Sequence, residues 1–383
     1  MATVDLLIPA YNAASTVRET VDSVQRQTMT DWRMVIINDG STDATGQMLA
    51  EMAAKDPRIH VHTQANRGVV DSLNVGLGLC TADIIARLDA DDLCYPNRLQ
   101  FQLDYLNAHP DVIGVGAGVR HIDDKSEPTG STAQIQSPDL ANPWFVPSAE
   151  PYLIHPFFTA RRWAMEAVKG YRHVHYAEDT DLYWRLRSHG RLVNPPDILG
   201  DYRFHADSIS SQGILNGRIM AINSQLTSIS EQRRLRGVND LIFTKDSLAE
   251  YKRVKTLREM MAIASVPLDA TERAYLQAAV PAKLLELAAY RPYELERSDC
   301  ECIGDLARAG FPMLSDANRR QMQRWITGAA ARVAVAGRMK DARRMVPTRM
   351  YPSFAPRYLM RTVLPESLRR SVRRGDTKAS TVK

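Results

Sequence analysis

Short apolar runs alternate with segments of helical periodicity in the first part of the chain. Four such runs predict strands of a sheet covered on both faces, at residues 4–8, 34–37, 59–63 and 83–86. Between them, apolar positions three or four apart predict helices, the first of which starts with a capping box formed by Thr16 and Glu19. This alternation predicts a doubly wound, mostly parallel α/β sheet with right-handed crossovers.

The pattern changes after this predicted sheet. A helix at 96–108 and an apolar strand at 112–119 are followed by residues 123–149, which are rich in Ser, Thr, Pro and Gly and predict a long loop. Beyond residue 214 strand signals fade, and amphipathic stretches at 248–264 and 271–289 predict a second module that is mainly α-helical.

Three carboxylates stand together directly after the predicted strand at 83–86. They belong to Asp89, Asp91 and Asp92. Open α/β sheets bind ligands at the carboxyl ends of their strands, and carboxylates two residues apart on extended backbone point the same way. Two of them can hold a hard divalent cation, which can in turn hold a diphosphate. The run therefore predicts a site for an activated phosphate ester, with a helix-capping role as the alternative for Asp92.

Composition narrows the class of protein. The chain has 383 residues, of which 44% are hydrophobic and 24% charged, as expected of a globular protein with a sizeable core. The Cys300–Cys302 spacing is too tight for a zinc knuckle, and no second cysteine pair follows it. The N-terminus lacks signal-peptide features, and no apolar run approaches the ~18 residues of a membrane span. We therefore expect a cytoplasmic protein.

Positive charge is concentrated at the C-terminus. Residues 338–383 hold thirteen Lys and Arg residues against three acids, a net charge of +10, which leaves −5 on the remainder. Arginines beside apolar residues four apart at 364–372 suit an interfacial segment on an anionic membrane, which would place the protein at the inner face of the cytoplasmic membrane. A helical cap folded back on the rest of the chain is the alternative. Nucleic acid is not expected, because no recognition motif accompanies the charge.

Several short motifs follow one another in a fixed order. They are Pro9-Ala10-Tyr11-Asn12, Asn38-Asp39-Gly40, Asn66-Arg67-Gly68, Asp89-Ala90-Asp91, His155-Pro156, Glu178-Asp179 and Tyr202-Arg203-x-His205. In this order they resemble the family 2 glycosyltransferases with the Rossmann-like GT-A fold, over roughly residues 4–211. The resemblance implies metal-dependent, inverting transfer of a hexosyl or N-acetylhexosaminyl group from a UDP-sugar to an acceptor hydroxyl. Bacterial surface polysaccharide or glycolipid synthesis is the expected setting.

The resemblance also suggests a domain organisation. The expected parts are a catalytic domain at 1–213, with a nucleotide-sugar half at about 1–122 and an acceptor half at about 123–213, a helical module at 214–337 and the basic segment at 338–383.

A nucleotide site is implied on the donor side. The residues that the resemblance assigns to it are Pro9, Ala10, Tyr11, Asn12, Asp39, Arg67, Gly68 and Asp89. Asp39 would accept a hydrogen bond from the uracil N–H, and Arg67 would contact the pyrophosphate. A strand-to-helix turn is the alternative for Tyr11, a turn or helix cap for Asp39, and an exposed loop position for Arg67.

A metal site follows from the same resemblance. Asp91 would ligate Mn²⁺ or Mg²⁺, while Asp89 would bind the ribose or a metal-bound water. His205 would complete the metal shell or touch a phosphate, with a structural role as its alternative.

The acceptor side is implied by residues of the later motifs. Asp179 is our choice for the general base and Glu178 the second choice, although both could instead favour the N-terminus of a helix. His155 and Trp184 would line the acceptor site, with buried core positions as their alternatives.

Two other functions are compatible with parts of the pattern. A degenerate transferase could serve as a nucleotide-sugar-binding or scaffold protein. A sugar-nucleotide pyrophosphorylase shares the α/β layout, but its first loop should be rich in Gly and basic residues, which the loop at 9–12 is not.

Overall fold

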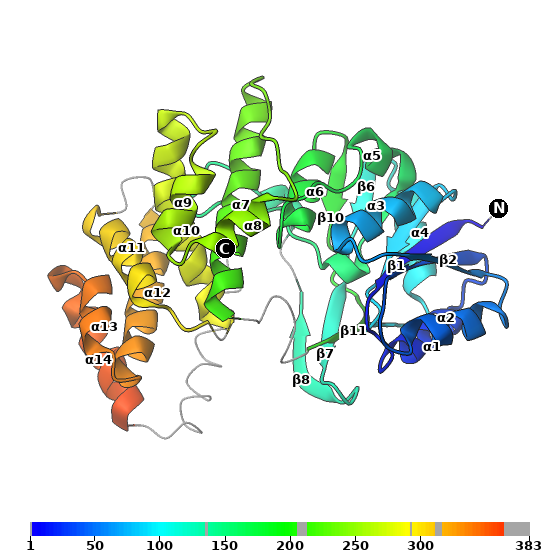
Figure 1. Cartoon of the computed structure of the whole chain (residues 1–383), viewed down its shortest axis with the longest axis horizontal. Helices are drawn as coiled ribbons and strands as arrows, with labels where there is room; N and C mark the ends of the chain where they lie inside the picture. Colours follow the sequence, from blue (N-terminus) through cyan, green and yellow to red (C-terminus); the bar gives the residue numbers. More distant parts are fainter. Residues whose placement is uncertain (1, 135–136, 205–212, 292, 311–315, 364–383) are drawn as a thin grey trace. The chain divides into compact units, whose positions relative to one another are not determined.

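The computed structural model describes residues 2–134, 137–204, 213–291, 293–310 and 316–363 (Figure 1). The chain divides into two compact units. An α/β unit takes Met1–Pro143, Ala149–Ser208 and Ser230–Lys245, and a helical unit takes Trp144–Ser148, Ile209–Ile229 and Asp246–Lys383.

A seven-stranded sheet forms the centre of the α/β unit. Its order is β10-β6-β9-β4-β1-β2-β3. The bounds are β1 Val4–Ala10, β2 Trp32–Asp39, β3 Ile59–Gln64, β4 Ile84–Arg87, β6 Val112–Val115, β9 Thr159–Arg161 and β10 Arg191–Val193. Only β9 runs antiparallel to its neighbours, β4 and β6. The predicted mixed α/β class with a mostly parallel sheet is therefore confirmed.

Helices cover both faces of this sheet, because successive side chains of a strand point to opposite sides. In β1, Leu6 and Ile8 pack with one group of helices and Leu7 with the other. The first face carries α1 Val17–Gln25, α2 Thr45–Ala53 and α4 Arg98–Ala108. The second face carries α3 Val69–Leu79, α5 Arg162–Ala167 and α6 Glu178–Leu186.

A second, four-stranded sheet lies in the same unit, with the order β5-β11-β7-β8. Its strands are β5 Leu93–Cys94, β7 Gly118–Ile122, β8 Pro128–Ala133 and β11 Ile198–Arg203. The predicted single strand at 112–119 is wrong, because β6 and β7 belong to different sheets. The amide of Gly116 still donates to Val193 of the first sheet, whereas the amide of Gly118 donates to Asp197, next to β11. The predicted long loop at 123–149 also contains β8.

Two helix predictions also need correction. The side chain of Thr16 accepts no hydrogen bond from the first turn of α1 and so does not cap it; its hydroxyl donates to the carbonyl of Ala90 at 3.0 Å. The stretch at 248–264 is two helices, α8 Ser247–Arg253 and α9 Leu257–Ala264, since Thr256 and Glu259 form a capping box that starts the second.

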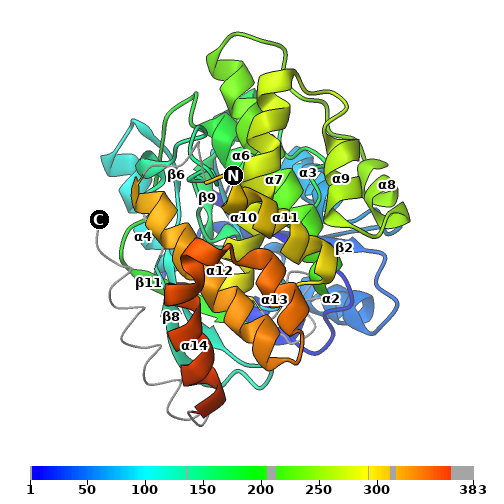
Figure 2. The same cartoon turned by 90° about the vertical axis from the view of Figure 1, so that its left-hand side faces the viewer.

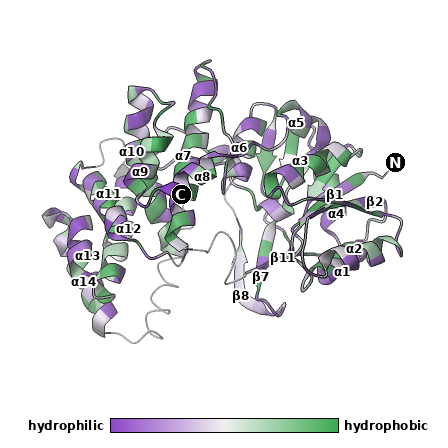
Figure 3. Ribbon diagram, in the orientation of Figure 1, coloured by the Kyte–Doolittle hydropathy of each residue, from purple (hydrophilic) through white to green (hydrophobic). Residues whose placement is uncertain are grey.

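The C-terminal half is helical, as predicted (Figures 2 and 3). After α7, which spans Gly213–Leu235, come α8 and α9 and then α10 Ala270–Tyr290, α11 Arg297–Arg308, α12 Asp316–Val335, α13 Met339–Met345 and α14 Tyr351–Val363. Among the helices of the described ranges, none combines the length and apolar character that a bilayer crossing needs.

Asp5 of β1 is a buried carboxylate that joins three segments of the α/β unit. Arg33 donates to its two oxygens at 2.8 and 2.6 Å, and the amides of Thr81 and Ala82 donate at 2.6 and 2.9 Å. Burial alone would raise the pKa of Asp5, but these four donors together hold that pKa below its ordinary value. The charged form of Asp5 therefore stabilises the fold.

Asp5→Asn should lower the free energy of unfolding by about 2–3 kcal/mol at pH 7, because an amide cannot accept all four hydrogen bonds. A lowered carboxyl pKa contributes stability above the unfolded value, so the difference from the wild type should shrink as pH falls below about 4. Urea unfolding at several pH values measures it. Asp83→Asn is the control, since that almost fully exposed carboxylate approaches Arg162 only to 3.6 Å. An equal effect of both substitutions would contradict the expectation.

Candidate functional site

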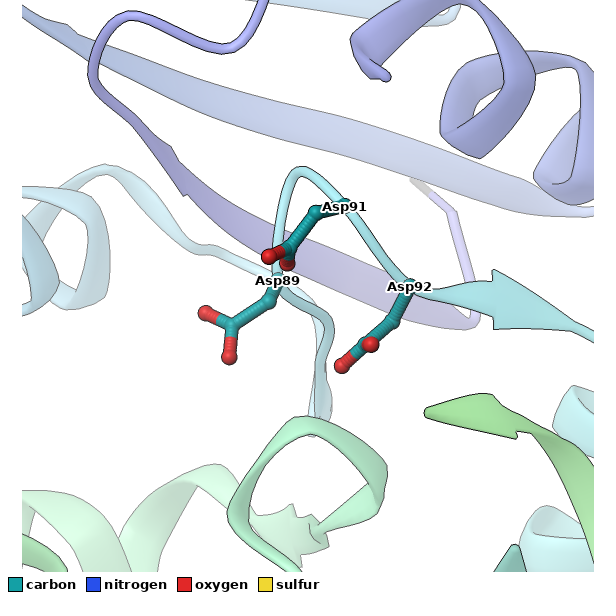
Figure 4. A group of neighbouring side chains, drawn as sticks. All are labelled: Asp89, Asp91 and Asp92. Carbon is teal, nitrogen blue, oxygen red and sulfur yellow. The ribbon is translucent and has the colours of Figure 1, made fainter. Parts of the chain in front are cut away.

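Three aspartates meet on the turn between β4 and β5. Ligand oxygens of Asp89, Asp91 and Asp92 all lie within 4.8 Å of one another, and Figure 4 shows the side chains directed to the same side of the turn. Hard oxygen donors at this spacing suit Mg²⁺ or Mn²⁺. The turn follows a strand end of the main sheet, which is where α/β proteins bind ligands.

Asp92 is the most deeply buried of the three aspartates. Its Oδ1 accepts a hydrogen bond from the amide of Arg203 at 2.8 Å, while its Oδ2 has no partner among the described residues. Burial, followed by the charges of Asp91 and Asp89, raises the pKa of Asp92 well above its ordinary value. No helix starts here, so the helix-capping alternative for Asp92 is wrong. An unsatisfied buried acceptor beside two further carboxylates fits a cation site.

Arg87, at the end of β4, supplies a positive charge next to this turn. Its Nη2 lies 2.5 Å from Oδ1 of Asp89, and its side chain is almost completely buried. Burial would lower the pKa of Arg87, but Asp89 and other nearby groups hold it above its ordinary value, so the guanidinium stays charged. Its Nε and Nη1 have no hydrogen-bond partner within the described ranges. Arg87 therefore offsets part of the charge of the aspartates.

The backbone of the turn is held from three other elements. The hydroxyl of Thr16 donates to the carbonyl of Ala90 at 3.0 Å, and Nε of Arg203 donates to the carbonyl of Asp91 at 2.8 Å. Behind the turn, Nη2 of Arg98 donates to the carbonyl of Arg87 at 2.6 Å. These contacts fix the direction in which the three carboxylates point.

Arg203 makes more contacts than its place in a short motif suggested. Besides the turn, its Nη1 donates to the carbonyl of Asp123 and the hydroxyl of Ser126, each at 2.9 Å, and its Nη2 pairs with Glu19 at 2.8 Å. No local pattern indicates a role for Arg203, because the two carbonyls and two side chains that it binds all lie far from it in sequence. His205, two residues later, lies outside the described residues.

Glu178 and Asp179 form the first turn of α6, and both side chains are half-buried. Burial, followed by the charge of Asp179, raises the pKa of Glu178 to about 7, and burial also raises the pKa of Asp179. Glu178 also interacts electrostatically with Asp89 and Arg87. The structure thus brings the paired acids into the electrostatic neighbourhood of the acidic turn.

Asp181, the third acid of this helix start, has a different environment. Its fully buried carboxylate pairs with Arg172 and accepts from Nε of Arg185 at 2.8 Å. Arg172 also pairs with Asp240 at 2.9 Å. Asp181 therefore anchors the start of α6.

Asp39 lies buried at the end of β2. Its Oδ1 accepts from Nε2 of Gln64 at 2.7 Å and from the amide of Arg67 at 2.9 Å, and its Oδ2 accepts from the amide of Gly68 at 2.8 Å. Gly40 follows with φ of +69°, and a Cβ there would lie 2.6 Å from the amide nitrogen of Asn66. Asp39 therefore fixes the loop that leads into α3.

The other residues implied in nucleotide binding surround this loop. Pro9 and Ala10 end β1, the side chain of Tyr11 is 51% exposed, and Oδ1 of Asn12 accepts from the amide of Thr42 at 2.8 Å. The side chain of Arg67 is exposed. Gly68 has φ of +88°, and nothing lies within 4 Å of where its Cβ would be. The loop can accept a ligand close to its backbone.

The two residues implied on the acceptor side are both buried. Nε2 of His155 lies 2.8 Å from the hydroxyl of Tyr171, and burial together with the charge of Arg87 lowers the pKa of His155 well below its ordinary value. Trp184 is fully buried in the core. Its ring offers no exposed face to a sugar, so the acceptor-side role expected for Trp184 needs correction to the core alternative.

Comparison with known proteins gives consistent matches. Residues 5–168 match the family model "Glycosyl transferase family 2". The putative glycosyltransferase EpsE of Bacillus subtilis is 31% identical over 211 residues, which cover 54% of this chain and 73% of that protein. The amylovoran biosynthesis glycosyltransferase AmsE of Erwinia amylovora is 28% identical over 211 residues, which cover 54% of this chain and 78% of that protein.

Among solved structures, this chain is similar in fold to a mannosyltransferase from Pyrobaculum calidifontis in complex with GDP-Man and Mn²⁺. Its TM-score is 0.49 at 17% identity, with 93% of this chain and 87% of that chain covered.

Arg203→Lys should weaken binding of Mn²⁺ about 10–100-fold, because a lysine cannot hold both the Asp91 carbonyl and Glu19 and the carboxylates lose their fixed direction. Titration calorimetry with Mn²⁺ alone measures it. Arg120→Lys is the matched control: Arg120 pairs with Asp201 of the same sheet at 2.7 and 2.8 Å and has no described contact with the turn. Equal losses of Mn²⁺ affinity in both variants would argue against a specific role of Arg203.

Proposed function

Since this chain belongs to glycosyl transferase family 2, we propose that it moves a sugar from a UDP-sugar to an acceptor hydroxyl, with inversion and with a divalent cation. It is a glycosyltransferase with polysaccharide synthases among its relatives, for example the chondroitin synthase of Escherichia coli, 29% identical over 214 residues. The observation that carries the proposal is the convergence of an acidic turn and a raised-pKa carboxylate pair around Arg87.

The cation would be Mn²⁺ or Mg²⁺ and would be held by Asp91 and Asp89, with Asp92 as a further candidate. Three carboxylates within 4.8 Å and the unpartnered Oδ2 of Asp92 support this donor set. When bound, the cation would supply charge compensation for the leaving diphosphate. Arg203, Thr16 and Arg98 would keep the carboxylates in place.

The donor nucleotide would lie beside Tyr11 and the Arg67–Gly68 loop. The exposed ring of Tyr11 can stack on a base, and the exposed guanidinium of Arg67 can reach a phosphate. Asp39 already accepts three hydrogen bonds, and a carboxylate has about four acceptor sites, which leaves one for the uracil N–H.

The acceptor would lose its proton to the Glu178–Asp179 pair. As the acceptor oxygen forms its bond to C1 of the sugar, the bond from C1 to the phosphate oxygen breaks and UDP leaves with the electron pair. Asp179 is our choice for the carboxylate that takes the proton. A raised pKa supports this role, because a base works best near the ambient pH.

The acceptor would be a growing glycan or a lipid-linked sugar of a bacterial surface polysaccharide. For the basic segment at 338–383 we propose an anionic membrane surface as partner, at the inner face of the cytoplasmic membrane.

Asp91→Asn should lower kcat by about 10²–10³-fold and remove the stabilisation that UDP gives in the presence of Mn²⁺, because an amide is a weaker ligand without charge. Transfer assays and thermal shifts over a panel of UDP- and GDP-sugars measure both. Asp83→Asn, directly before β4 and at the other end of that strand from the acidic turn, is the control. Undiminished transfer by wild-type enzyme in EDTA would overturn metal dependence, and donor binding without transfer to any acceptor would favour the scaffold alternative.

Asp179→Asn should lower kcat by about 10²–10⁴-fold if this carboxylate takes the proton. In wild-type enzyme kcat/KM should fall on the acid side at a pH above the ordinary pKa of an aspartate, because burial raises the pKa of Asp179 and its carboxyl must lose its proton before it can act as base. Glu178→Gln should retain more activity and shift this acidic limb to lower pH, since removal of a neighbouring negative charge lowers the pKa of Asp179. Profiles of kcat/KM against pH test this. Near-normal transfer by Asp179→Asn together with loss of transfer by Glu178→Gln would show that Glu178, and not Asp179, takes the proton.

A further inference from the structure

Helix α14 presents an uncharged and mostly apolar face to solvent. We define the α14 stripe as its six exposed apolar residues, Tyr351, Pro352, Ala355, Pro356, Leu359 and Met360. The largest of them are 38% (Tyr351), 58% (Leu359) and 48% (Met360) exposed. At 3.6 residues per turn, all six fall within one half of the helix circumference. Solvent-facing helices ordinarily place charged residues on this side.

The opposite face of α14 is fixed to the rest of the helical unit. Phe354 is buried and stacks on Tyr358, with ring centroids 6.1 Å apart. A Cβ built on Gly328 of α12 would lie 3.8 Å from Nη1 of Arg357. Figure 1 shows α13 and α14 at one end of this unit. The stripe is thus held outward by packing.

The segment that contains the stripe carries an excess of positive charge. Residues 338–362 hold seven Lys and Arg residues against Asp341 alone, a net charge of +6. That aspartate is already paired with Arg338 and Arg344, each at 2.8 Å. Lys340 and Arg343 of α13 are exposed. The segment 338–362 therefore combines an exposed uncharged stripe on α14 with exposed cations on α13.

An anionic lipid surface matches both properties of this region. Leu, Met and Tyr side chains can enter the boundary between headgroups and acyl chains, while Lys and Arg meet the phosphates. A second copy of the chain fits less well, because pairing through the same stripe would bring two segments of charge +6 together. In sequence, the four-residue spacing of Pro356 and Met360 continues at Leu364, Leu368 and Val372, which lie outside the described residues.

We propose that the α14 stripe, with the basic residues of α13, docks on the surface of an anionic bilayer. The helix would lie in the plane of the headgroups with Leu359 and Met360 inserted. This inference rests on the membrane partner proposed above and specifies the face that would meet it; it involves no residue of the acidic turn and does not depend on which sugar is transferred.

Sedimentation of the full chain with vesicles tests the proposal, using phosphatidylcholine with or without phosphatidylglycerol. Wild type should bind the mixed vesicles, and high salt should weaken that binding. Leu359→Gln with Met360→Gln should lower the partition coefficient at least about tenfold, since two apolar side chains no longer insert. Lys340→Gln with Arg343→Gln should also lower the partition coefficient about tenfold, and this loss should be confined to vesicles that contain phosphatidylglycerol.

Val266→Gln is the matched control, because Val266 lies in the same unit and is 80% exposed but is not part of the stripe. Equal binding by wild type, the control and the Leu359–Met360 variant would overturn the proposal. So would concentration-dependent self-association in light scattering that the variant abolishes without any vesicle binding. Hydrolysis of the UDP-sugar in solution should be the same in all variants, so failure of the docking proposal stays distinct from failure of the proposed transfer.

Discussion

The buried guanidinium of Arg87 partly compensates the negative charge of carboxylates that come from two distant parts of the chain. It pairs directly with Asp89, and its charge opposes the rise that burial causes in the pKa values of Asp92, Glu178 and Asp179. Concentrating negative charge in a partly buried site is unfavourable, because ions lose hydration and repel one another. The positive charge of Arg87 therefore makes this concentration of carboxylates compatible with a stable fold. Because Arg87 compensates only part of their negative charge, the site remains suited to a bound metal ion.

A buried hydrogen-bond network behind the acidic turn keeps the turn in place despite the repulsion between its carboxylates. Arg98 is fully buried, donates to the carbonyl of Arg87 and to Gln102, and Gln102 in turn donates to carbonyls of Gly116 and Phe157. This buried network joins β4, α4 and the crossing point between the two sheets. Breaking any hydrogen bond of this network would leave a buried polar group without a partner. The acidic turn therefore has little freedom to move in a way that would separate its charges.

The sequence allowed the sheet to be predicted because each strand carries a local apolar pattern, and parallel strands bring their carboxyl ends to one edge. Asp39, Asp89 and Asp91 could be located for that reason. Arg203 could not, because a buried arginine that binds carbonyls and a carboxylate distant in sequence leaves no local pattern. The role of Arg87 could not either, because its charge acts on Glu178 and Asp179, which lie far along the chain. Thr16 shows the same limit: its hydroxyl matched a capping box, but the carbonyl of Ala90, 74 residues away, takes the hydrogen bond. Tertiary contacts here override local preference.

The start of α6 shows how the fold separates residues that the sequence makes look equivalent. Glu178, Asp179 and Asp181 are all acids in the first turn, where the helix dipole favours negative charge. Two arginines pair with Asp181, whereas within the described ranges neither Glu178 nor Asp179 has an ion pair. The oxygens of Asp181 are thereby engaged by guanidinium groups. Glu178 and Asp179, which have no such ion pair, have raised pKa values, and this difference is why the proposed proton acceptor is one of them and not Asp181.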